Sequence, residues 1–369
     1  IPPMKQENRE SAPGQNCPPR GPIAPALLEW FYRHRRSLPF REDPTPYHIW
    51  VSEIMLQQTR MTAAVPYYLR IIQALPTVEE LARCPEDQRA KLWEGLGYSS
   101  RMRNPQKAAR LICEKYGGAL PASLEELKKL PGVGEYTAGA IASIGFGLPA
   151  PAVDGNVLRV FSRLWRDERD ISTPAAKKEC AARVMAQQPP EAAGDFNQAL
   201  MELGALVCLP GTPDCAACPL KELCSSYGTP DAARLPVKAP RAERKVRPVT
   251  VVLARSEQGF LLGRRGRGGL LAGLWQPLLW EEGLEKEETL ARLKQMGLEP
   301  ESSEALPPAR HVFTHVEWRM SGWYCRVGQA PAPEGFVWAE PDQIREEYAL
   351  PGAFKVYRAL MLDESGNFL

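Results

Sequence analysis

The sequence has no long apolar run, and its first segment lacks the pattern of a secretory signal. No stretch approaches the ~20 apolar residues that span a bilayer. Residues 1–22 are polar and rich in proline, without an apolar centre. We therefore expect a cytoplasmic protein that contacts no membrane, with residues 1–22 forming a disordered tail.

Net charge and histidine are also scarce. The formal net charge is only +2 at pH 7, so a polyanionic partner would have to be bound by local groups of basic residues. Such groups occur at residues 33–36, 101–110 and 264–267, although each alone is more often a solvated surface. Two of the four histidines, His311 and His315, lie in the segment HVFTHVEW. No cysteine or carboxylate cluster accompanies them, so a metal site there is disfavoured.

The nine cysteines are odd in number and do not form the pattern of a disulfide framework. Four of them are close together in the sequence: Cys208, Cys215, Cys218 and Cys224. A C-x2-C pair can place two sulfurs on one metal because the intervening turn directs both inward. The pattern predicts a metal or cluster site in a reducing compartment, rather than four unrelated buried thiols. Spacing alone leaves a Cys₄ zinc site and a 4Fe–4S cluster open.

The spacing of apolar residues changes along the chain. From residue 23 to about 207 it has a helical period. Residues 229–248 are basic and rich in proline, as linkers are. Beyond them the period indicates strands at 249–265, 311–327 and 334–340, with helices at 284–297 and 351–362. We expect a multidomain protein with an all-α first part and a smaller α+β second part.

The segment LPGVGEYTAG lies inside the helical part. A helix is expected to end at Pro131, and Gly132, Val133 and Gly134 form a tight turn before a second helix. Backbone amides at the start of that second helix would point outward and could bind a phosphate. This is the arrangement with which a helix-hairpin-helix grips a DNA backbone without reading its sequence. A plain helical corner is the alternative.

Two carboxylates have contrasting surroundings. Glu53 is expected in the middle of an apolar helix, where desolvation would raise its pKa and let it act as a general acid. Asp154 lies where a proline-containing segment meets a new helix, which is the position of an N-cap. The helix N-terminus would favour its charged form. One protonated and one ionised carboxyl group can together cleave a glycosidic bond through an oxocarbenium-like state.

These segments together resemble the endonuclease III-like superfamily of helix-hairpin-helix DNA glycosylases, over residues 25–225. The resemblance implies that the four cysteines hold one 4Fe–4S cluster and that Asp154 is the catalytic aspartate. Bifunctional members carry a lysine two residues after GVG, which forms a Schiff base. This chain has Tyr136 there, and a phenol cannot form an imine. It therefore resembles the adenine DNA glycosylases of MutY type.

The MutY-type resemblance implies a role for several further side chains. Glu53 would protonate N7 of adenine, while Tyr136 and Asn156 would orient Asp154 and the nucleophile. Flipping adenine out of the duplex leaves a gap to be filled. The residues matching DNA-contacting positions are Gln58, Thr59, Leu96, Tyr98, Gly132, Val133 and Gly134. Those matching the adenine pocket are Arg41, Leu56 and Gln198, beside Phe40 where the family often has tryptophan.

The second part resembles the MutT-like (Nudix) module that is fused to adenine glycosylases. A Nudix hydrolase holds Mg²⁺ with paired acidic residues, but Lys294 and Gln295 occupy those positions here. The module is therefore expected to read DNA without hydrolysing nucleotides. In the family a Phe-Ser-His loop reads 8-oxoguanine, and this chain has Phe313, Thr314 and His315. Threonine keeps the hydroxyl group, but its extra methyl restricts χ1.

The expected function is a monofunctional adenine DNA glycosylase that hydrolytically removes adenine opposite 8-oxoguanine, and also opposite guanine. Its partner would be double-stranded DNA with such mispairs, and it would act as a monomer in the bacterial cytoplasm, associated with the nucleoid. The expected domains are a glycosylase domain at 23–228, a linker at 229–248 and a lesion-recognition domain at 249–369. The alternatives are an endonuclease III-type glycosylase/lyase for oxidised pyrimidines and a non-catalytic Fe–S protein that binds lesion DNA.

Overall fold

The computed structural model describes residues 18–57, 59–96, 100–240, 243–266 and 268–363. The predicted tail, up to residue 17, lies outside these ranges, as do Gln58 and Tyr98. The chain forms two compact units: Ile1–Ile72 with Leu111–Pro240, and Gln73–Arg110 with Arg241–Leu369. In the described residues no helix is both long and apolar enough to cross a membrane.

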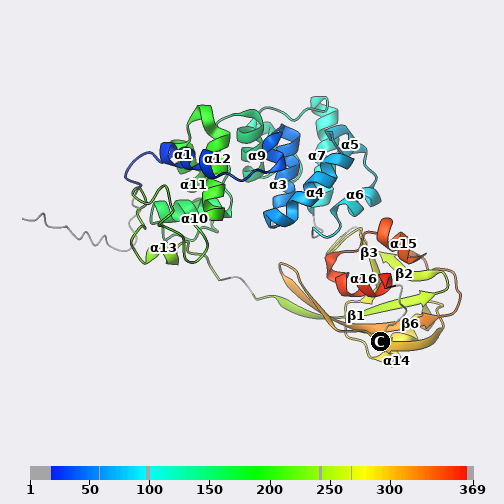
Figure 1. Ribbon diagram of the computed structural model, residues 1–369. Helices are drawn as coiled ribbons and strands as arrows, with labels where there is room; N and C mark the ends of the chain where they lie inside the picture. Colours follow the sequence, from blue (N-terminus) through cyan, green and yellow to red (C-terminus); the bar gives the residue numbers. More distant parts are fainter. Residues whose placement is uncertain (1–17, 58, 97–99, 241–242, 267, 364–369) are drawn as a thin grey trace, which may run out of the picture. The chain divides into compact units, whose positions relative to one another are not determined.

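The first unit is built from helices, as Figure 1 shows. Their bounds are α1 Ala24–His34, α2 Pro39–Glu42, α3 Pro46–Leu56, α4 Met61–Ala74, α8 Leu124–Lys128, α9 Glu135–Ala140, α10 Gly155–Leu164, α11 Pro174–Gln187, α12 Ala193–Leu206 and α13 Asp231–Arg234. A π-helix, Ile141–Gly145, continues α9, and a 3₁₀ turn, Pro190–Ala192, precedes α12. Helices α1, α10 and α12 share a core that includes the fully buried Phe31, Phe161 and Phe196. Burying each such side chain contributes roughly 1.5–3 kcal/mol.

The predicted hairpin is present between α8 and α9. Gly132 has φ of 79°, a left-handed conformation that glycine adopts without strain, and Gly134 precedes α9 in an extended conformation. Gly139 lets α9 approach the chain that leads to α10, since a Cβ atom there would lie 1.9 Å from the carbonyl oxygen of Pro151. The hairpin thereby places Tyr136 and Asp154 in one region of the unit.

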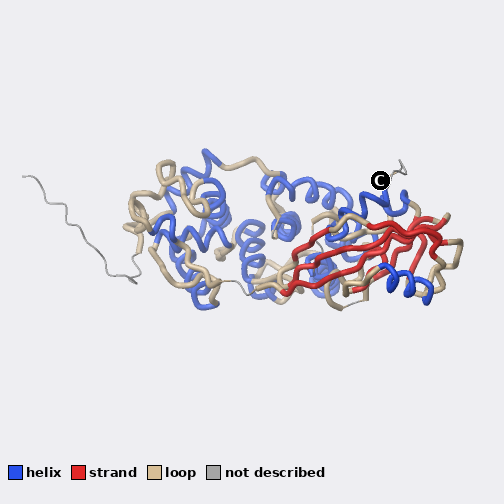
Figure 2. Tube along the Cα trace, turned by 90° about the horizontal axis from the view of Figure 1, so that it is seen from below, coloured by secondary structure: helices blue, strands red, loops and turns tan. Residues whose placement is uncertain are grey.

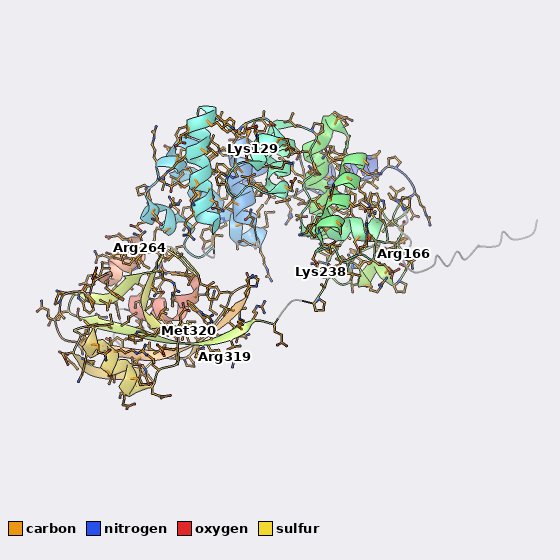
Figure 3. The ribbon with its side chains drawn as sticks, turned by 180° about the vertical axis from the view of Figure 1, so that it is seen from behind. Lys129, Arg166, Lys238, Arg264, Arg319 and Met320 are labelled. Carbon is orange, nitrogen blue, oxygen red and sulfur yellow. The ribbon has the colours of Figure 1, made fainter. Side chains whose placement is uncertain are left out.

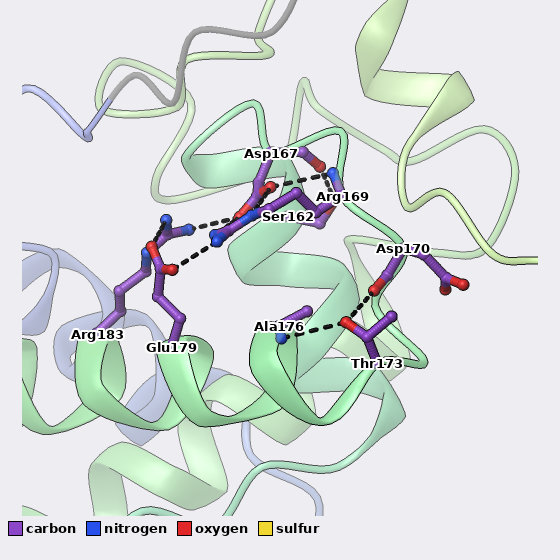
Figure 4. A network of polar contacts seen from close by, with 8 residues as sticks. All are labelled: Ser162, Asp167, Arg169, Asp170, Thr173, Ala176, Glu179 and Arg183. Atoms are coloured by element: carbon purple, nitrogen blue, oxygen red, sulfur yellow. Dashed lines mark hydrogen bonds and ion pairs between the residues drawn. The ribbon is translucent and has the colours of Figure 1, made fainter.

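A polar network fixes the segment between α10 and α11 (Figure 4). Arg183 donates to Asp167 at 2.9 Å, and Arg169 bridges Asp167 and Glu179. The Thr173 side chain caps α11 by accepting from the amide of Ala176. Four side chains of alternating charge stabilise this turn together, because each carboxylate contacts two guanidinium groups.

The second unit combines helices α5 Val78–Arg83, α6 Glu86–Trp93 and most of α7 Ser100–Tyr116 with a mixed sheet. The strands are β1 Lys245–Ser256, β2 Gly259–Arg264, β3 Trp275–Trp280, β4 Pro300–Ala305, β5 Ala309–Val312, β6 Val316–Val327 and β7 Phe336–Ala339. Their order is β4-β6-β1-β3-β2-β7, with β5 paired to β6. The β1–β6 pair is parallel and the other pairs are antiparallel.

Helices cover both faces of this sheet (Figures 1 and 2). Helix α14 Lys286–Gln295 packs on one face, where Leu293 joins Val252 and Cys325 in a core. On the other face lie α15 Pro341–Glu346, a 3₁₀ turn Gly352–Phe354 and α16 Lys355–Leu362. Side chains of β6 alternate between core and solvent, so that Met320 is buried while its neighbour Arg319 is exposed (Figure 3).

The predicted fold class is confirmed: an all-α helix-hairpin-helix part is followed by an α+β part. The linker is shorter than composition indicated. Leu235 is buried, the carbonyl of Val237 accepts from the amide of Ile171, and β1 begins at Lys245. The first residues of β1 are exposed, so the sequence there has no alternation of apolar and polar residues that would predict a strand. Helix α15 and strands β3 and β4 were not predicted.

Residues 73–110 group with the C-terminal unit, although the expected domain division placed them in the glycosylase part. Lys91 donates through Nζ to the carbonyl of Ile344 at 3.2 Å. Glu94 accepts from the backbone amide of Leu350 at 2.9 Å. These contacts use ordinary surface side chains and backbone groups, which sequence patterns do not distinguish from solvated ones.

Candidate active site

The carboxylates predicted to carry the chemistry face one cavity in the first unit. The cavity has a volume of about 590 Å³. Residues from α2, α3, α9, α10 and α12 line it: Arg41, Glu53, Leu56, Thr59, Tyr136, Asp154, Asn156, Gln198, Met201 and Glu202 among them. The predicted catalytic and adenine-pocket residues are therefore brought together from segments far apart in the sequence.

Glu53 lies in the middle of α3 and is only 6% exposed. Its Oε2 accepts a hydrogen bond of 2.5 Å from the hydroxyl of Tyr136. Burial raises the pKa of Glu53 to about 7, with a smaller rise from the charge of Asp154 and an opposing effect from Tyr136. A carboxyl group with this pKa holds a proton in a substantial fraction of molecules at neutral pH, as a general acid requires.

Asp154 is the N-cap of α10, as the sequence indicated. Its Oδ1 accepts from the amide of Val157 at 2.7 Å, and its Oδ2 accepts from Nδ2 of Asn156 at 2.8 Å. The helix N-terminus was expected to favour the charged form, but the pKa is raised. Burial is the largest cause and outweighs the bonds from Val157 and Asn156, which lower the pKa. The helix N-terminus thus favours the charged form as expected, but burial, which the sequence did not reveal, is the larger effect.

Tyr136 and Asn156 were both expected to orient Asp154, and the geometry separates their roles. Asn156 donates to Asp154 directly. The single hydroxyl proton of Tyr136 is directed to Glu53, and the Tyr136 oxygen lies 3.5 Å from the sulfur of Met201. Burial raises the pKa of Tyr136 well above its usual value, and the charge of Glu53 adds to this. Tyr136 therefore remains a neutral donor that orients the acid.

A cluster of ionic groups forms one wall of the cavity. Glu202 is 1% exposed and accepts from Arg36 at 2.8 Å and from Arg41 at 3.0 Å. Burial would raise its pKa, but the two guanidinium groups outweigh burial and hold the pKa at about 2. Arg41 also donates through Nε to Oε1 of Gln198 at 3.0 Å. That bond directs the Gln198 amide nitrogen away from Arg41.

Sequence reasoning missed Glu202, Arg36 and Arg159. A charged residue between apolar neighbours on α12, as in Met201-Glu202-Leu203, was the available signal for Glu202. Arg159, on α10, donates to Oδ1 of Asn156 at 2.9 Å and to the carbonyl of Cys208 at 2.8 Å. It therefore joins the residue that holds Asp154 to the beginning of the cysteine loop.

The four predicted cysteines line a second, smaller cavity of about 30 Å³. Burial raises the pKa of Cys218 to about 12, and the charges of Cys208, Cys215 and Cys224 raise it further. Four thiolates this close together need a compensating cation. Arg163 lies beside them, 3.3 Å from the sulfur of Cys208. The donor set and its arrangement fit a group that takes four thiolate ligands.

Among the described residues, no group of three or more His, Cys, Asp or Glu side chains is placed to hold a metal ion. A single zinc ion would require four sulfurs at about 2.3 Å from one point. The cysteine side chains instead surround a cavity. The four side chains could therefore share one bound group.

The remaining predicted positions do not line the catalytic cavity, or they lie outside the described residues. Leu96 is buried in the second unit, and Val133 is buried within the hairpin between exposed glycines. Lys129, which is labelled in Figure 3, lies just before the hairpin. It is exposed and pairs with Glu126. Lys294 and Gln295 end α14. The segment Phe313–His315 is the loop between β5 and β6.

The chain matches two family models. Residues 51–185 match the HhH-GPD superfamily of base excision DNA repair proteins, and residues 249–359 match the NUDIX domain. These matches agree with the helix-hairpin-helix unit and with the mixed sheet flanked by helices.

The chain is also similar to curated proteins and to solved structures. An adenine DNA glycosylase of Homo sapiens is 33% identical over 406 residues, which cover 93% of this chain and 74% of that protein. An adenine DNA glycosylase of Buchnera aphidicola subsp. Baizongia pistaciae (strain Bp) is 32% identical over 79% of this chain and 82% of that protein. A solved thermostable thymine-DNA glycosylase matches with a TM-score of 0.50 and 29% identity over 55% of this chain and 93% of its own. Since similarity of this extent runs through both parts, the chain belongs to the family of adenine DNA glycosylases.

Proposed function

We propose that this chain flips adenine out of duplex DNA and hydrolyses its N-glycosidic bond when the opposite base is 8-oxoguanine or guanine. The observation that carries the proposal is the pairing of Glu53 and Asp154 in one cavity. Burial gives Glu53 a pKa of about 7, and Asn156 and the α10 amide hold Asp154 by hydrogen bonds. Two carboxyl groups with different environments can divide the roles of acid and anion.

Glu53 is the general acid. Tyr136 donates to Oε2, so the acidic proton resides on Oε1 and can pass to N7 of the flipped adenine. Protonation weakens the bond between C1′ and N9 by drawing electrons into the base. When that bond breaks, its electron pair leaves with the neutral adenine and the sugar becomes an oxocarbenium-like cation.

Asp154 stabilises the developing sugar cation. With Glu53 protonated, the pair carries one negative charge, so Asp154 can ionise without repulsion from its neighbour. Asn156 holds the orientation of the Asp154 carboxylate. Water then adds to C1′, its hydroxyl group forms the new bond, and the remaining proton returns to the carboxylate pair.

The composition of the cavity supports hydrolysis without strand cleavage. Among the described residues that line it there is no lysine, and Tyr136 stands at the family position of the Schiff-base lysine. A phenol hydroxyl can donate a proton but cannot form an imine with the opened sugar. An endonuclease III-type lyase activity is therefore disfavoured.

Cys208, Cys215, Cys218 and Cys224 would hold one 4Fe–4S cluster. When bound, the cluster supplies the cation that the four thiolates require and cross-links the loop that carries them. Arg163 would donate to the sulfur of Cys208, and it also donates to the carbonyls of Leu209 and Gly211. Iron and sulfide analysis tests the assignment. Stoichiometric zinc without iron would overturn it.

The loop of Phe313, Thr314 and His315 would read the base opposite adenine. Thr314 and His315 are exposed, and the Thr314 hydroxyl can accept a hydrogen bond from N7–H of 8-oxoguanine, a group that guanine lacks. The hairpin of Gly132, Val133 and Gly134 would contact the DNA backbone, because the amides that begin α9 are not side-chain capped.

The deciding experiment is base release from duplexes holding A:8-oxoG, A:G, A:C and thymine-glycol pairs. Wild type, Glu53→Gln and Asp154→Asn are compared, with Glu29→Gln as a control because Glu29 is exposed on α1. The proposal predicts free adenine from A:8-oxoG that either active-site substitution abolishes and the control retains. Strand nicking with an imine trapped by borohydride would favour the lyase instead. Binding without base release would favour the non-catalytic alternative.

A further inference from the structure

The loop between β5 and β6 is tightly closed by its own backbone. The amide of Phe313 donates to the carbonyl of Val316 at 2.8 Å. Thr314 and His315 form its exposed tip. A closed loop of three residues has few internal contacts, so the orientation of its tip depends on what holds it from outside.

Two contacts from the chain around the start of β1 hold the loop. Nε of Arg244 donates to the carbonyl of Phe313 at 3.2 Å. The backbone amide of Lys245 donates to the carbonyl of His315, also at 3.2 Å. The two carbonyls lie on either side of Thr314 in the sequence. Together these bonds fix the peptide groups that set where the Thr314 hydroxyl points.

The position of Arg244 follows from the sheet. Strand β1 pairs in parallel with β6 beginning at Lys245 and Val316. Arg244 is the residue immediately before this first pair, so its side chain reaches across the loop that leads into β6. No other element of the described sheet supplies a side-chain donor to these carbonyls.

Aromatic rings hold the other side of the loop. The rings of His311 and Phe313 lie 4.6 Å apart, and those of Phe313 and Trp318 lie 4.9 Å apart, both in edge-to-face contact. Trp318 is fully buried, with the guanidinium of Arg265 over its ring at 5.4 Å. These contacts fix the Phe313 ring. They do not fix the peptide that follows it, which is what Arg244 binds.

We propose that Arg244 is a positioning residue for this loop and that it thereby sets the preference for 8-oxoguanine over guanine. The inference rests on the proposed lesion-reading role of Phe313, Thr314 and His315. A hydroxyl group discriminates N7–H from a bare N7 only when it is well aligned, since hydrogen bonds weaken steeply with angle. Releasing the Phe313 carbonyl lets the Thr314 peptide rotate. The hydrogen bond to N7–H is then weakened in the 8-oxoguanine duplex only, because guanine offers no N7–H.

If Arg244 acted only through its charge, its loss would affect the two duplexes differently from this prediction. An exposed arginine can contact a phosphate, and losing such a contact weakens binding to every duplex alike. Arg326 is the matched control: it is also exposed, and it lies at the other end of β6, where it pairs with Ser302. Arg326→Ala removes the same charge from the same sheet without touching the loop.

Arg244→Gln separates the hydrogen bond from the charge. The amide nitrogen of glutamine stands as many bonds from the backbone as Nε of arginine, so it can donate to the same carbonyl while carrying no charge. The full chain is used, and single-turnover rates and half-saturation are measured on A:8-oxoG and A:G. Arg244→Ala is expected to lower the preference for A:8-oxoG about three- to tenfold, with the rate on A:G within twofold of wild type. Arg244→Gln and Arg326→Ala are expected to retain the preference.

The triple variant completes the test. Adding Arg244→Ala to Thr314→Ala/His315→Ala is expected to cause no further loss of preference, because the residues that Arg244 positions are already gone. Suppose that Thr314→Ala/His315→Ala abolishes the preference. If Arg244→Ala then leaves the preference intact, or lowers the rates on both duplexes equally, the role of Arg244 is wrong and the proposed function stands. If Arg244→Gln behaves as Arg244→Ala, charge rather than the bond is responsible, and the inference is wrong. If Thr314→Ala/His315→Ala keeps the preference, the lesion-reading role itself fails.

Discussion

The hydroxyl of Tyr136 donates to Oε2 of Glu53 over 2.5 Å, from the second helix of the hairpin to a buried helix 83 residues earlier in the chain. This bond ties the motif proposed to hold DNA to the acid proposed to protonate the base. It also stabilises the ionised form of Glu53, and so it opposes the effect of burial on the pKa of that carboxyl group.

Tyr136→Phe removes this bond and is expected to raise the pKa of Glu53 above its present value of about 7. A bond of this kind is worth about 1–2 kcal/mol, or about one pH unit. Since the protonated acid is the active form, the alkaline fall in adenine release should move upward by about one unit. Single-turnover rates between pH 5 and 10 measure the shift. A downward shift would show that Tyr136 favours the protonated form instead.

Glu53→Gln is expected to make the protein more stable at alkaline pH than wild type. The folded pKa of Glu53 is raised, from 4.5 to about 7, so the folded state binds more protons than the unfolded state between these values. The contribution of this group to stability is therefore lost as pH rises from 4.5 through about 7, by up to about 3 kcal/mol. Glutamine does not ionise and still accepts from Tyr136.

Denaturant unfolding at pH 5 and pH 8 measures this difference. The increase in the free energy of unfolding caused by Glu53→Gln should be larger at pH 8 than at pH 5. Equal effects at both pH values would mean that the pKa of Glu53 is not raised in the folded protein.

Glu202→Gln should destabilise the protein strongly. It removes the carboxylate that neutralises Arg36 and Arg41 within the fold, and leaving buried charge unpaired typically costs about 3–5 kcal/mol. The control is Glu29→Gln, which breaks an exposed i,i+4 pair with Arg33 and should change stability by less than about 0.5 kcal/mol. The free energy of unfolding at pH 7 distinguishes them. A loss at Glu202 as small as that at Glu29 would show that the cluster is not coupled to folding.

Arg163→Ala is expected to lower the iron content of the purified protein. Its guanidinium group donates to the carbonyls of Leu209, Gly211 and Leu235 and lies against the sulfur of Cys208. Its loss therefore releases the start of the cysteine loop and the segment at Leu235. Iron per chain and visible absorbance measure the effect. Arg166→Ala is the control, because Arg166 lies two residues after the end of α10 and pairs with Asp231 instead. Full iron content in Arg163→Ala would contradict this role.

Much of the active site could be predicted because its residues lie in strong local patterns. Glu53 is surrounded by apolar residues at helical spacing, and Asp154 stands at a helix start that proline and glycine mark. The four cysteines are predictable from their density. In each case the chemistry follows from neighbours in the sequence.

The rest depended on contacts between distant segments. Glu202 meets Arg36 across 166 residues, and no local pattern links the two residues. Asp154 was expected to stay ionised because its helix start is a local feature of the sequence, whereas the burial that raises its pKa arises only in the folded chain. The length of the linker was overestimated for a related reason. The first part of β1 is exposed, and its partner in the sheet lies 71 residues later in the sequence, since Lys245 pairs with Val316.

The central claim, that Glu53 is a buried general acid for adenine release, is tested most directly by the single-turnover rate on an A:8-oxoG duplex as a function of pH. The rate should fall as pH rises through about 7, and Glu53→Gln should abolish release at every pH while still binding the duplex. A rate that is constant from pH 5 to pH 9, or adenine release by Glu53→Gln at the wild-type rate, would contradict the assignment.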